Sequence, residues 1–124
     1  MKTAIVDVLT IGIPVGDQER ALAFFVERLG FEKRLDAQAG DAGRWLTVAA
    51  PGAATDLALV ADPAGAGRGT GIRFSVPDAA AEHAAMAAAG VEVGALLRWP
   101  GVPAMFEFQD VDGNRFTVLE AASR

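Results

Sequence analysis

The chain of 124 residues contains no cysteine and a single histidine, His83. The absence of cysteine excludes disulfide scaffolds, thiolate zinc sites, iron–sulfur clusters and cysteine nucleophiles. One histidine excludes any site that needs two imidazoles from one chain. No apolar run approaches the ~18 residues of a membrane span, and the N-terminal segment lacks the features of a secretory signal. We therefore expect a cytoplasmic protein that does not enter a membrane.

Basic residues are also scarce, with 11 Lys and Arg against 16 Asp and Glu and a net charge of −5. This charge repels a phosphate backbone, and the basic residues are not clustered, so we expect no nucleic-acid partner. Hydrophobic residues make up 52% of the chain, which is too many for a disordered protein. The length fits one globular domain, 1–124.

The chain carries an internal repeat at an offset of 61 residues (71 − 10). Segment 10–17 aligns with segment 71–78, and both alternate apolar side chains as a strand with one buried face does. Each ends on an aspartate, Asp17 or Asp78, which can cap a helix by accepting hydrogen bonds from free N–H groups. The repeat predicts two similar modules.

The elements after each aspartate also correspond. A helical pattern after Asp17 stops at Gly30, and an alanine-rich one after Asp78 stops at Gly90. The expected strands that follow are 31–35, 44–48 and 56–60 in the first half, and 91–97, 104–108 and 114–120 in the second. Each half is thus βαβββ. We expect an α+β fold with modules at about 4–62 and 70–122, joined by the glycine-rich linker 62–71.

Two glycine-containing segments resemble ligand loops without meeting their requirements. The linker lacks the GxxxxGK[ST] pattern and leads into a strand, whereas a phosphate loop leads into a helix. Segment 110–114 lacks the spacing and the terminal glutamate of an EF-hand. We interpret it as a hairpin turn in which Gly113 and Asn114 can adopt positive φ.

The paired modules resemble the vicinal oxygen chelate superfamily, which contains glyoxalase I, bleomycin-resistance proteins and extradiol dioxygenases. The resemblance rests on segments 17–31 (DQERALAFFVERLGF) and 108–120 (FQDVDGNRFTVLE). It implies an open barrel around a cleft, and a homodimer in which modules of one or two chains complete each cleft. It also places the usual metal ligands at Thr10, Ala58, Gly71 and Thr117. None is a carboxylate or an imidazole, so we expect no metal cofactor.

Alternation along the strands predicts which side chains face the cleft. Val8 is expected there and Leu9 on the helix side. Arg73 and Glu107 are candidates for orienting a ligand, or for a cross-strand ion pair, and Trp45 for stacking or for filling the core. The predicted ligand-binding residues are Thr10, Trp45, Thr47, Arg73, Ser75, Met105, Glu107 and Thr117.

Trp99 and His83 lie outside this set. Trp99 is expected on a loop that covers the cleft or the dimer seam. His83 is expected to be a partly buried helix histidine on the far side of the sheet. We predict no catalytic residue.

These observations favour a metal-independent homodimer that binds a small organic molecule. The alternative is a glyoxalase-type lyase, isomerase or dioxygenase that uses a divalent metal such as Ni, Zn or Fe, with ligands from Asp7, Asp56, Glu107 and Glu120. A third possibility is a structural or partner-binding dimer whose cleft is filled by its own side chains. The sequence does not name the ligand.

Overall fold

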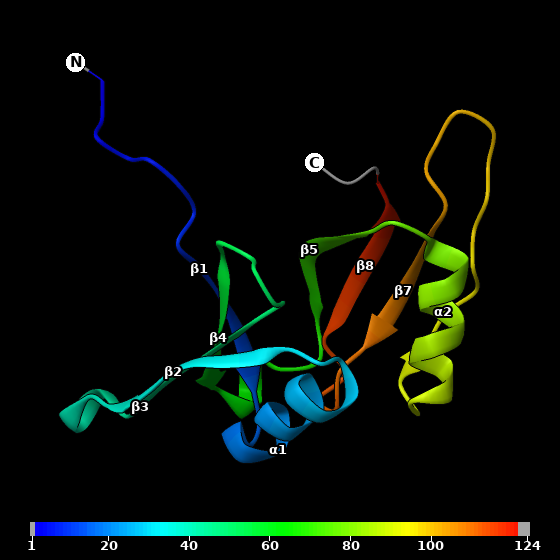
Figure 1. The fold of residues 1–124 in the computed structure, drawn as a ribbon. Coiled ribbons are helices and arrows are strands. Elements are labelled where there is room, and N and C mark those ends of the chain that lie inside the picture. Colours follow the sequence, from blue (N-terminus) through cyan, green and yellow to red (C-terminus); the bar gives the residue numbers. More distant parts are fainter. Residues whose placement is uncertain (1, 122–124) are drawn as a thin grey trace.

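The computed structural model describes residues 2–121 and contains two mixed, four-stranded sheets (Figure 1). Each module contributes one sheet, in which the first strand runs parallel to the fourth. The first has the order β1-β4-β3-β2 and the second β5-β8-β7-β6. The strands are β1 (Thr10–Val15), β2 (Glu32–Gln38), β3 (Arg44–Ala49), β4 (Asp56–Ala61), β5 (Gly69–Val76), β6 (Glu92–Val93), β7 (Met105–Gln109) and β8 (Arg115–Glu120). The predicted α+β fold of two βαβββ modules is confirmed, although the sheets do not close into a barrel.

Each module has one main helix, and both begin at the predicted aspartates. α1 (Gln18–Ala23) continues into a π-helical turn, η1 (Phe24–Arg28), and α2 spans Ala79–Ala88. The carboxylate of Asp17 accepts from the N–H of Arg20 at 3.1 Å, and that of Asp78 accepts from the N–H of Ala81 at 3.0 Å. Short 3₁₀ turns, η2 (Gly40–Ala42) and η3 (Pro63–Gly65), lie in the connections. No helix within residues 2–121 is both long and apolar enough to cross a membrane.

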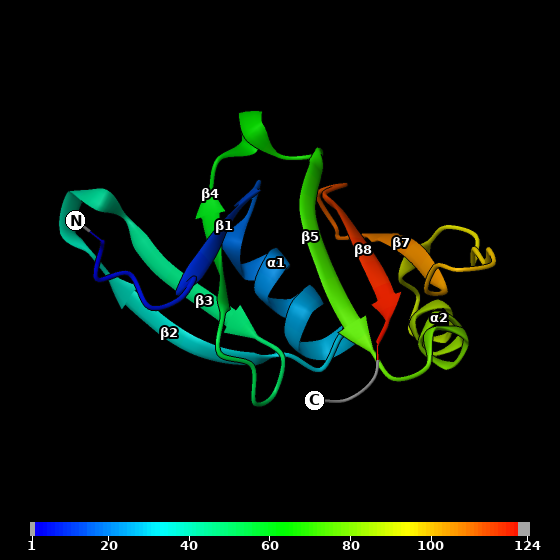
Figure 2. The same ribbon diagram turned by 90° about the horizontal axis from the view of Figure 1, so that it is seen from above.

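The helical segment α1–η1 lies between the two sheets, as seen from above in Figure 2. Phe25, which is fully buried, contacts the rings of Phe31 and of Phe116 on β8, with centroids 5.6 and 6.0 Å apart. Apolar side chains of both sheets join one cluster around it: Ile13, Val15, Leu46, Val48, Leu57, Leu59, Phe106, Phe108, Phe116 and Val118. Both sheets therefore turn one face toward a shared core.

The turn 110–114 ties the second module to the first. Asn114 is fully buried, and its amide donates to the carbonyl of Pro14 at 2.8 Å and to Asp110 at 2.9 Å. Its side-chain oxygen accepts from the N–H of Gly67 at 2.9 Å. Gly113 has the predicted positive φ of 81°, but Asn114 does not, so that part of the prediction is wrong. The contact with Pro14 comes from the other module and the contact with Gly67 from the linker, so a local reading of the turn cannot supply them.

Two other local predictions fail for lack of a backbone partner. The segment 91–97 forms only the two-residue strand β6 and an isolated bridge from Leu97 to Met105. Residues 2–9, the N-terminal arm, form no strand, because β4 begins opposite Thr10. Leu9 is 78% exposed and does not pack on the helix side.

Candidate functional site

Each sheet has one face that points away from the shared core, and we call these the first and second open faces. On the second open face, Arg73, Thr117 and Glu107 are neighbours across β5, β8 and β7. Arg73 and Glu107 are exposed, and neither forms an ion pair with any of residues 2–121. They do not form the cross-strand pair considered above, because β8 separates their strands.

A less polar row runs beside these three residues. Ser75, Leu119 and Met105 are paired across the same three strands, and the bridge to Leu97 extends the row. Trp99, two residues beyond Leu97, is 54% exposed. The second open face thus offers two opposite charges and a hydroxyl beside an apolar strip, a combination that can orient a small ligand.

The first open face carries the other predicted residues. Trp45 is 49% exposed, so it does not fill the core, and Leu35 and Val60 beside it are 42% and 45% exposed. On the same face, Thr47 is buried. Large exposed apolar side chains grouped on one sheet face are typical of a surface that receives a ligand or another protein.

A polar cluster lies at one end of the first open face. Asp56 accepts hydrogen bonds from Arg34 and from the Thr47 hydroxyl, both at 3.1 Å. Arg34 also donates to the carbonyl of Ala53 at 2.7 Å. The hydroxyl of Thr10, whose strand position pairs with Asp56, is buried and has no hydrogen-bond partner among residues 2–121. The carboxylate of Asp56 is therefore already engaged by its own neighbours.

The eight predicted ligand-binding residues do not meet in one chain. Thr10, Trp45 and Thr47 lie on the first open face, whereas Arg73, Ser75, Met105, Glu107 and Thr117 lie on the second. Because both sheets turn their other faces to the same core, the open faces look away from it. A cleft that uses both sets needs a second copy of the chain.

The carboxylates considered as metal ligands are also dispersed. Asp7 lies in the N-terminal arm, Asp56 in the polar cluster and Glu107 on the second open face. Glu120 accepts from the N–H of Ala79 at 3.1 Å, at the start of α2. No group of three or more His, Asp or Glu side chains within residues 2–121 is placed to hold a metal ion.

The single histidine lies on α2 and contacts the core. Its ring meets Phe106 edge to face at 5.0 Å, and its Nε2 is 2.7 Å from the carbonyl oxygen of Gly94. His83 therefore lies on the core side of the second sheet and does not reach its open face.

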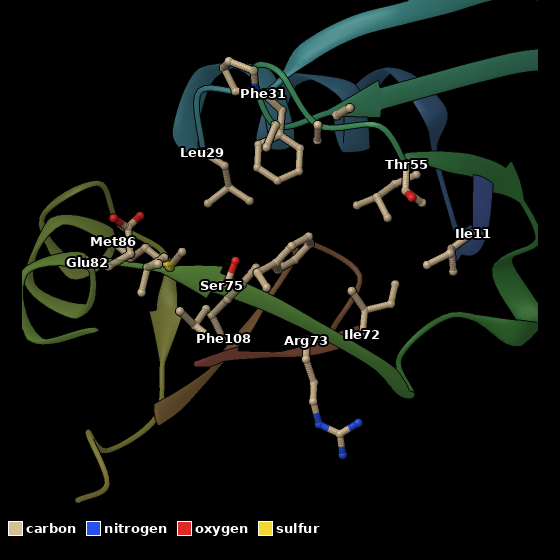
Figure 3. Close-up of a pocket in the computed structure, with 18 of the residues that line it drawn as sticks. Ile11, Leu29, Phe31, Thr55, Ile72, Arg73, Ser75, Glu82, Met86 and Phe108 are labelled. Carbon is tan, nitrogen blue, oxygen red and sulfur yellow. The ribbon is translucent and has the colours of Figure 1, made fainter. Parts of the chain in front are cut away.

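An apolar cavity of about 590 Å³ lies between the modules, and we call it the inter-module cavity (Figure 3). It lies on the core side of the sheets. Two of the predicted ligand-binding residues, Arg73 and Ser75, border it, although Figure 3 shows the side chain of Arg73 pointing away from it. Its main apolar side chains are Ile11, Leu29, Phe31, Leu57, Ile72, Phe74 and Met86. The alternation of side chains along the strands does not reveal this cavity. The alanine-rich second helix, with Met86 as its one large apolar side chain, was the available signal.

Comparison with known proteins identifies one family and a relative of similar length. The model of the Glyoxalase/Bleomycin resistance protein/Dioxygenase superfamily matches residues 7–118. YetH of Bacillus subtilis (strain 168) is 30% identical over 116 residues, which span 90% of this chain and 95% of that protein.

Two solved structures are similar over almost the whole chain. TnmS3, an antibiotic binding protein from Streptomyces sp. CB03234, is 35% identical, with a TM-score of 0.84 and coverage of 98% of this chain and 100% of that one. A superfamily member from Sphaerobacter thermophilus DSM 20745 is 34% identical, with a TM-score of 0.87 and coverage of 96% and 100%. The repeated βαβββ modules, the sheet order and these matches together establish that the chain belongs to the glyoxalase/bleomycin resistance protein/dioxygenase superfamily.

Proposed function

We propose that this protein binds a small organic molecule in a cleft formed by two copies of the chain. The main supporting observation is the row of Arg73, Thr117 and Glu107 on the second open face, whose two charges have no ion-pair partner within residues 2–121. A guanidinium and a carboxylate fixed on neighbouring strands can bind an acceptor and a donor of the same ligand. The adjacent side chains of Leu119 and Met105 supply apolar contact.

In this proposal, the first open face of the second copy forms the opposite wall of the cleft. Trp45 presents half of its surface to solvent, with Leu35 and Val60 nearby. An exposed indole can stack on a flat or cationic ligand, and burial of these side chains favours closure of the cleft. TnmS3 is an antibiotic binding protein and is 35% identical to this chain, which supports a small-molecule ligand here.

The proposal uses no resident metal. Ala58 and Gly71, at two of the four positions where the family resemblance expects ligands, carry no donor atom in their side chains. Asp56, the carboxylate next to Thr10, is already bound by Arg34 and Thr47. Recognition in this proposal therefore depends on side chains of the two open faces.

Ligand titration tests the proposal. Bleomycin and a panel of other small organic antibiotics are titrated while tryptophan fluorescence is followed, because Trp45 is the expected reporter. For any compound that binds, Arg73→Ala and Glu107→Ala should each weaken binding about tenfold, the loss of one charged hydrogen bond. Arg68→Ala, on the linker, removes the same charge as Arg73→Ala and is the matched control for that variant. Wild-type affinity in both face variants would contradict the proposal.

Native mass spectrometry with added Ni²⁺, Zn²⁺ or Fe²⁺ tests the alternative. A dimer that takes up no stoichiometric metal fits the binding proposal. One tightly held ion per cleft would instead favour the glyoxalase-type lyase, isomerase or dioxygenase, and assays of those activities would follow.

A further inference from the structure

The charged side chains of the second open face are sorted by strand. Arg73 on β5 and Arg115 on β8 are basic, whereas Glu107 on β7 and Glu92 on β6 are acidic. Arg115 and Glu92 share this face, because both pair with the same residue of β7. All four side chains are exposed, and none forms an ion pair with any of residues 2–121. One half of the face is therefore positive and the other negative, which favours a ligand with charges of both signs.

A bulge in β5 brings its arginine close to the arginine of β8. From Gly69 to Arg73, β5 advances four residues. Opposite them, β8 advances only two residues, from Arg115 to Thr117. The hydroxyl of Thr70, inside the bulge, donates to the carbonyl of Arg115 at 2.8 Å and so ties the bulge to β8. The bulge shortens the separation of the two arginines along the sheet from about 13 Å to about 7 Å.

The guanidinium of Arg115 is largely available to another molecule. It leans over the start of β5, where it donates to the carbonyl of Gly67 at 3.5 Å. A Cβ atom on Gly69 would lie 3.5 Å from its Nη2, so the missing side chain at this position leaves room for the guanidinium. One long hydrogen bond leaves most of its five N–H groups for a ligand.

Thr117 lies at the centre of these groups. Arg73 is beside it on β5, and Glu107 is beside it on β7. On β8 itself, Arg115 precedes it on the same face and Leu119 follows it. Neighbouring strands are about 4.8 Å apart, so the long side chains around Thr117 can reach one small group above it. Such a group meets guanidiniums, a carboxylate and an apolar side chain in different directions.

We propose that the second open face binds a small molecule with an α-amino acid group and an apolar side chain. The carboxylate of the ligand binds Arg73 and Arg115, and its ammonium binds Glu107. Its apolar side chain lies along Leu119 and Met105. Charge-assisted hydrogen bonds of both signs fix the orientation of the ligand on the sheet. This assignment rests on the proposed function, because it names the chemical class of the ligand that the cleft binds.

A matched series of naphthalene compounds tests the class of ligand. Naphthylalanine carries all three groups, naphthylpropionate lacks the ammonium, and naphthylethylamine lacks the carboxylate. Titration at neutral pH, followed by NMR of the isotope-labelled protein, should give naphthylalanine a dissociation constant at least about tenfold below that of either relative. The shifted signals should centre on residues 115–119. No binding of naphthylalanine at about 5 mM, or equally tight binding of either relative, would overturn the assignment.

Two variants should give opposite patterns with the two incomplete compounds. Arg115→Gln should weaken naphthylalanine and naphthylpropionate about tenfold each but not naphthylethylamine, because only the first two carry a carboxylate. Glu107→Gln should instead weaken naphthylalanine and naphthylethylamine but not naphthylpropionate. Arg20→Gln on α1 and Glu27→Gln on η1 are the matched controls for charge. Equal weakening of all three compounds by either face variant would contradict the assignment.

Failure of this assignment is distinguishable from failure of the proposed function. The antibiotic titrations of wild type, Arg73→Ala and Glu107→Ala decide whether the cleft binds a small molecule through this face. A cleft that passes those titrations but binds naphthylpropionate or naphthylethylamine as tightly as naphthylalanine would retain the proposed function and lose the amino acid class.

Discussion

Arg44, at the start of β3, joins two carboxylates from different elements. Its guanidinium donates to both oxygens of Asp36 on β2, at 2.8 and 2.9 Å, and to Glu19 of α1. The hydrogen bond from Arg44 is the main reason that the pKa of Asp36 falls from 3.8 to about 2. A lowered folded-state pKa means that this pair stabilises the protein above pH 3.8, and that the stabilisation is lost as the pH falls through about 2.

The pair predicts a pH-dependent difference between variants. We expect Asp36→Asn to have a lower free energy of unfolding than wild type at neutral pH, and the two values to converge as the pH approaches 2. Urea unfolding at a series of pH values measures this. Asp41→Asn, which removes a carboxylate without an ion pair in residues 2–121, controls for net charge. A difference that persists unchanged to the lowest pH would contradict the assignment.

Asn114 predicts a larger effect on stability. Asn114→Ala leaves the carbonyl of Pro14 and the N–H of Gly67 without their partners. We expect a loss of about 3 kcal/mol in the free energy of unfolding, because each buried group without a partner costs about 1–3 kcal/mol. Gln109→Ala, on the exposed face of neighbouring β7, should cost much less. An equal loss in the two variants would show that the hydrogen bonds of the Asn114 side chain add little to stability.

The same variant should change the titration of Asp110. Burial raises the pKa of the Asp110 carboxyl, and the side-chain hydrogen bond from Asn114 opposes that rise. Without Asn114 the pKa should rise further, which a carbon NMR titration of the carboxyl group measures.

At the scale of elements, α2 ends against the first module. Arg28 of η1 donates to the carbonyls of Ala89 and Gly90, at 3.4 and 3.0 Å. The last carbonyls of a helix lack partners within it, and a positive charge there is favourable.

We therefore expect Arg28→Ala to speed hydrogen exchange in the last turn of α2 about fivefold, which corresponds to about 1 kcal/mol. Arg20→Ala removes a guanidinium from the same helical segment without touching α2, and should leave that exchange unchanged. Faster exchange in both variants would indicate a general loss of stability.

The sequence predicts these helices better than some of the strands, for a physical reason. The caps at Asp17 and Asp78 depend on N–H groups only three residues away, so local sequence determines them. A strand needs a neighbouring strand for its backbone hydrogen bonds, and the N-terminal arm has no such partner before Leu9. Likewise, segment 91–97 pairs only briefly with β7. Alternation of apolar and polar side chains therefore predicts more strand in each of these two segments than the structure contains.

At the scale of the whole molecule, the two sheets share one core through Phe25, and this predicts cooperative unfolding. The two tryptophans report on different modules, Trp45 on the first and Trp99 on the second. The variants Trp45→Phe and Trp99→Phe, each with one remaining reporter, should each have coincident fluorescence and far-UV circular dichroism midpoints in urea, because neither module can lose the shared cluster alone. Separated fluorescence and circular dichroism midpoints in either variant would contradict a single core.

The site was predictable only in part from the sequence. Strand alternation identifies Arg73, Thr117 and Glu107 as one face, since β5 pairs regularly with β8 from Arg73 onward and β7 pairs regularly with β8. It does not reveal that Trp45 and Arg73 lie on faces turned away from a common core, because module packing depends on contacts distant in sequence. The inter-module cavity was missed for the same reason.

The exposed strand β2 has a consequence for how far assembly can go. All seven of its residues are exposed and it pairs only with β3, so its outer edge offers free backbone groups to any neighbouring strand. Glu32, Lys33, Arg34 and Asp36 place four charges on this edge. Another strand would have to desolvate them in order to pair, which is how natural sheets resist fibre formation. The charges on β2 thus oppose growth of the first sheet by addition of a strand from another molecule.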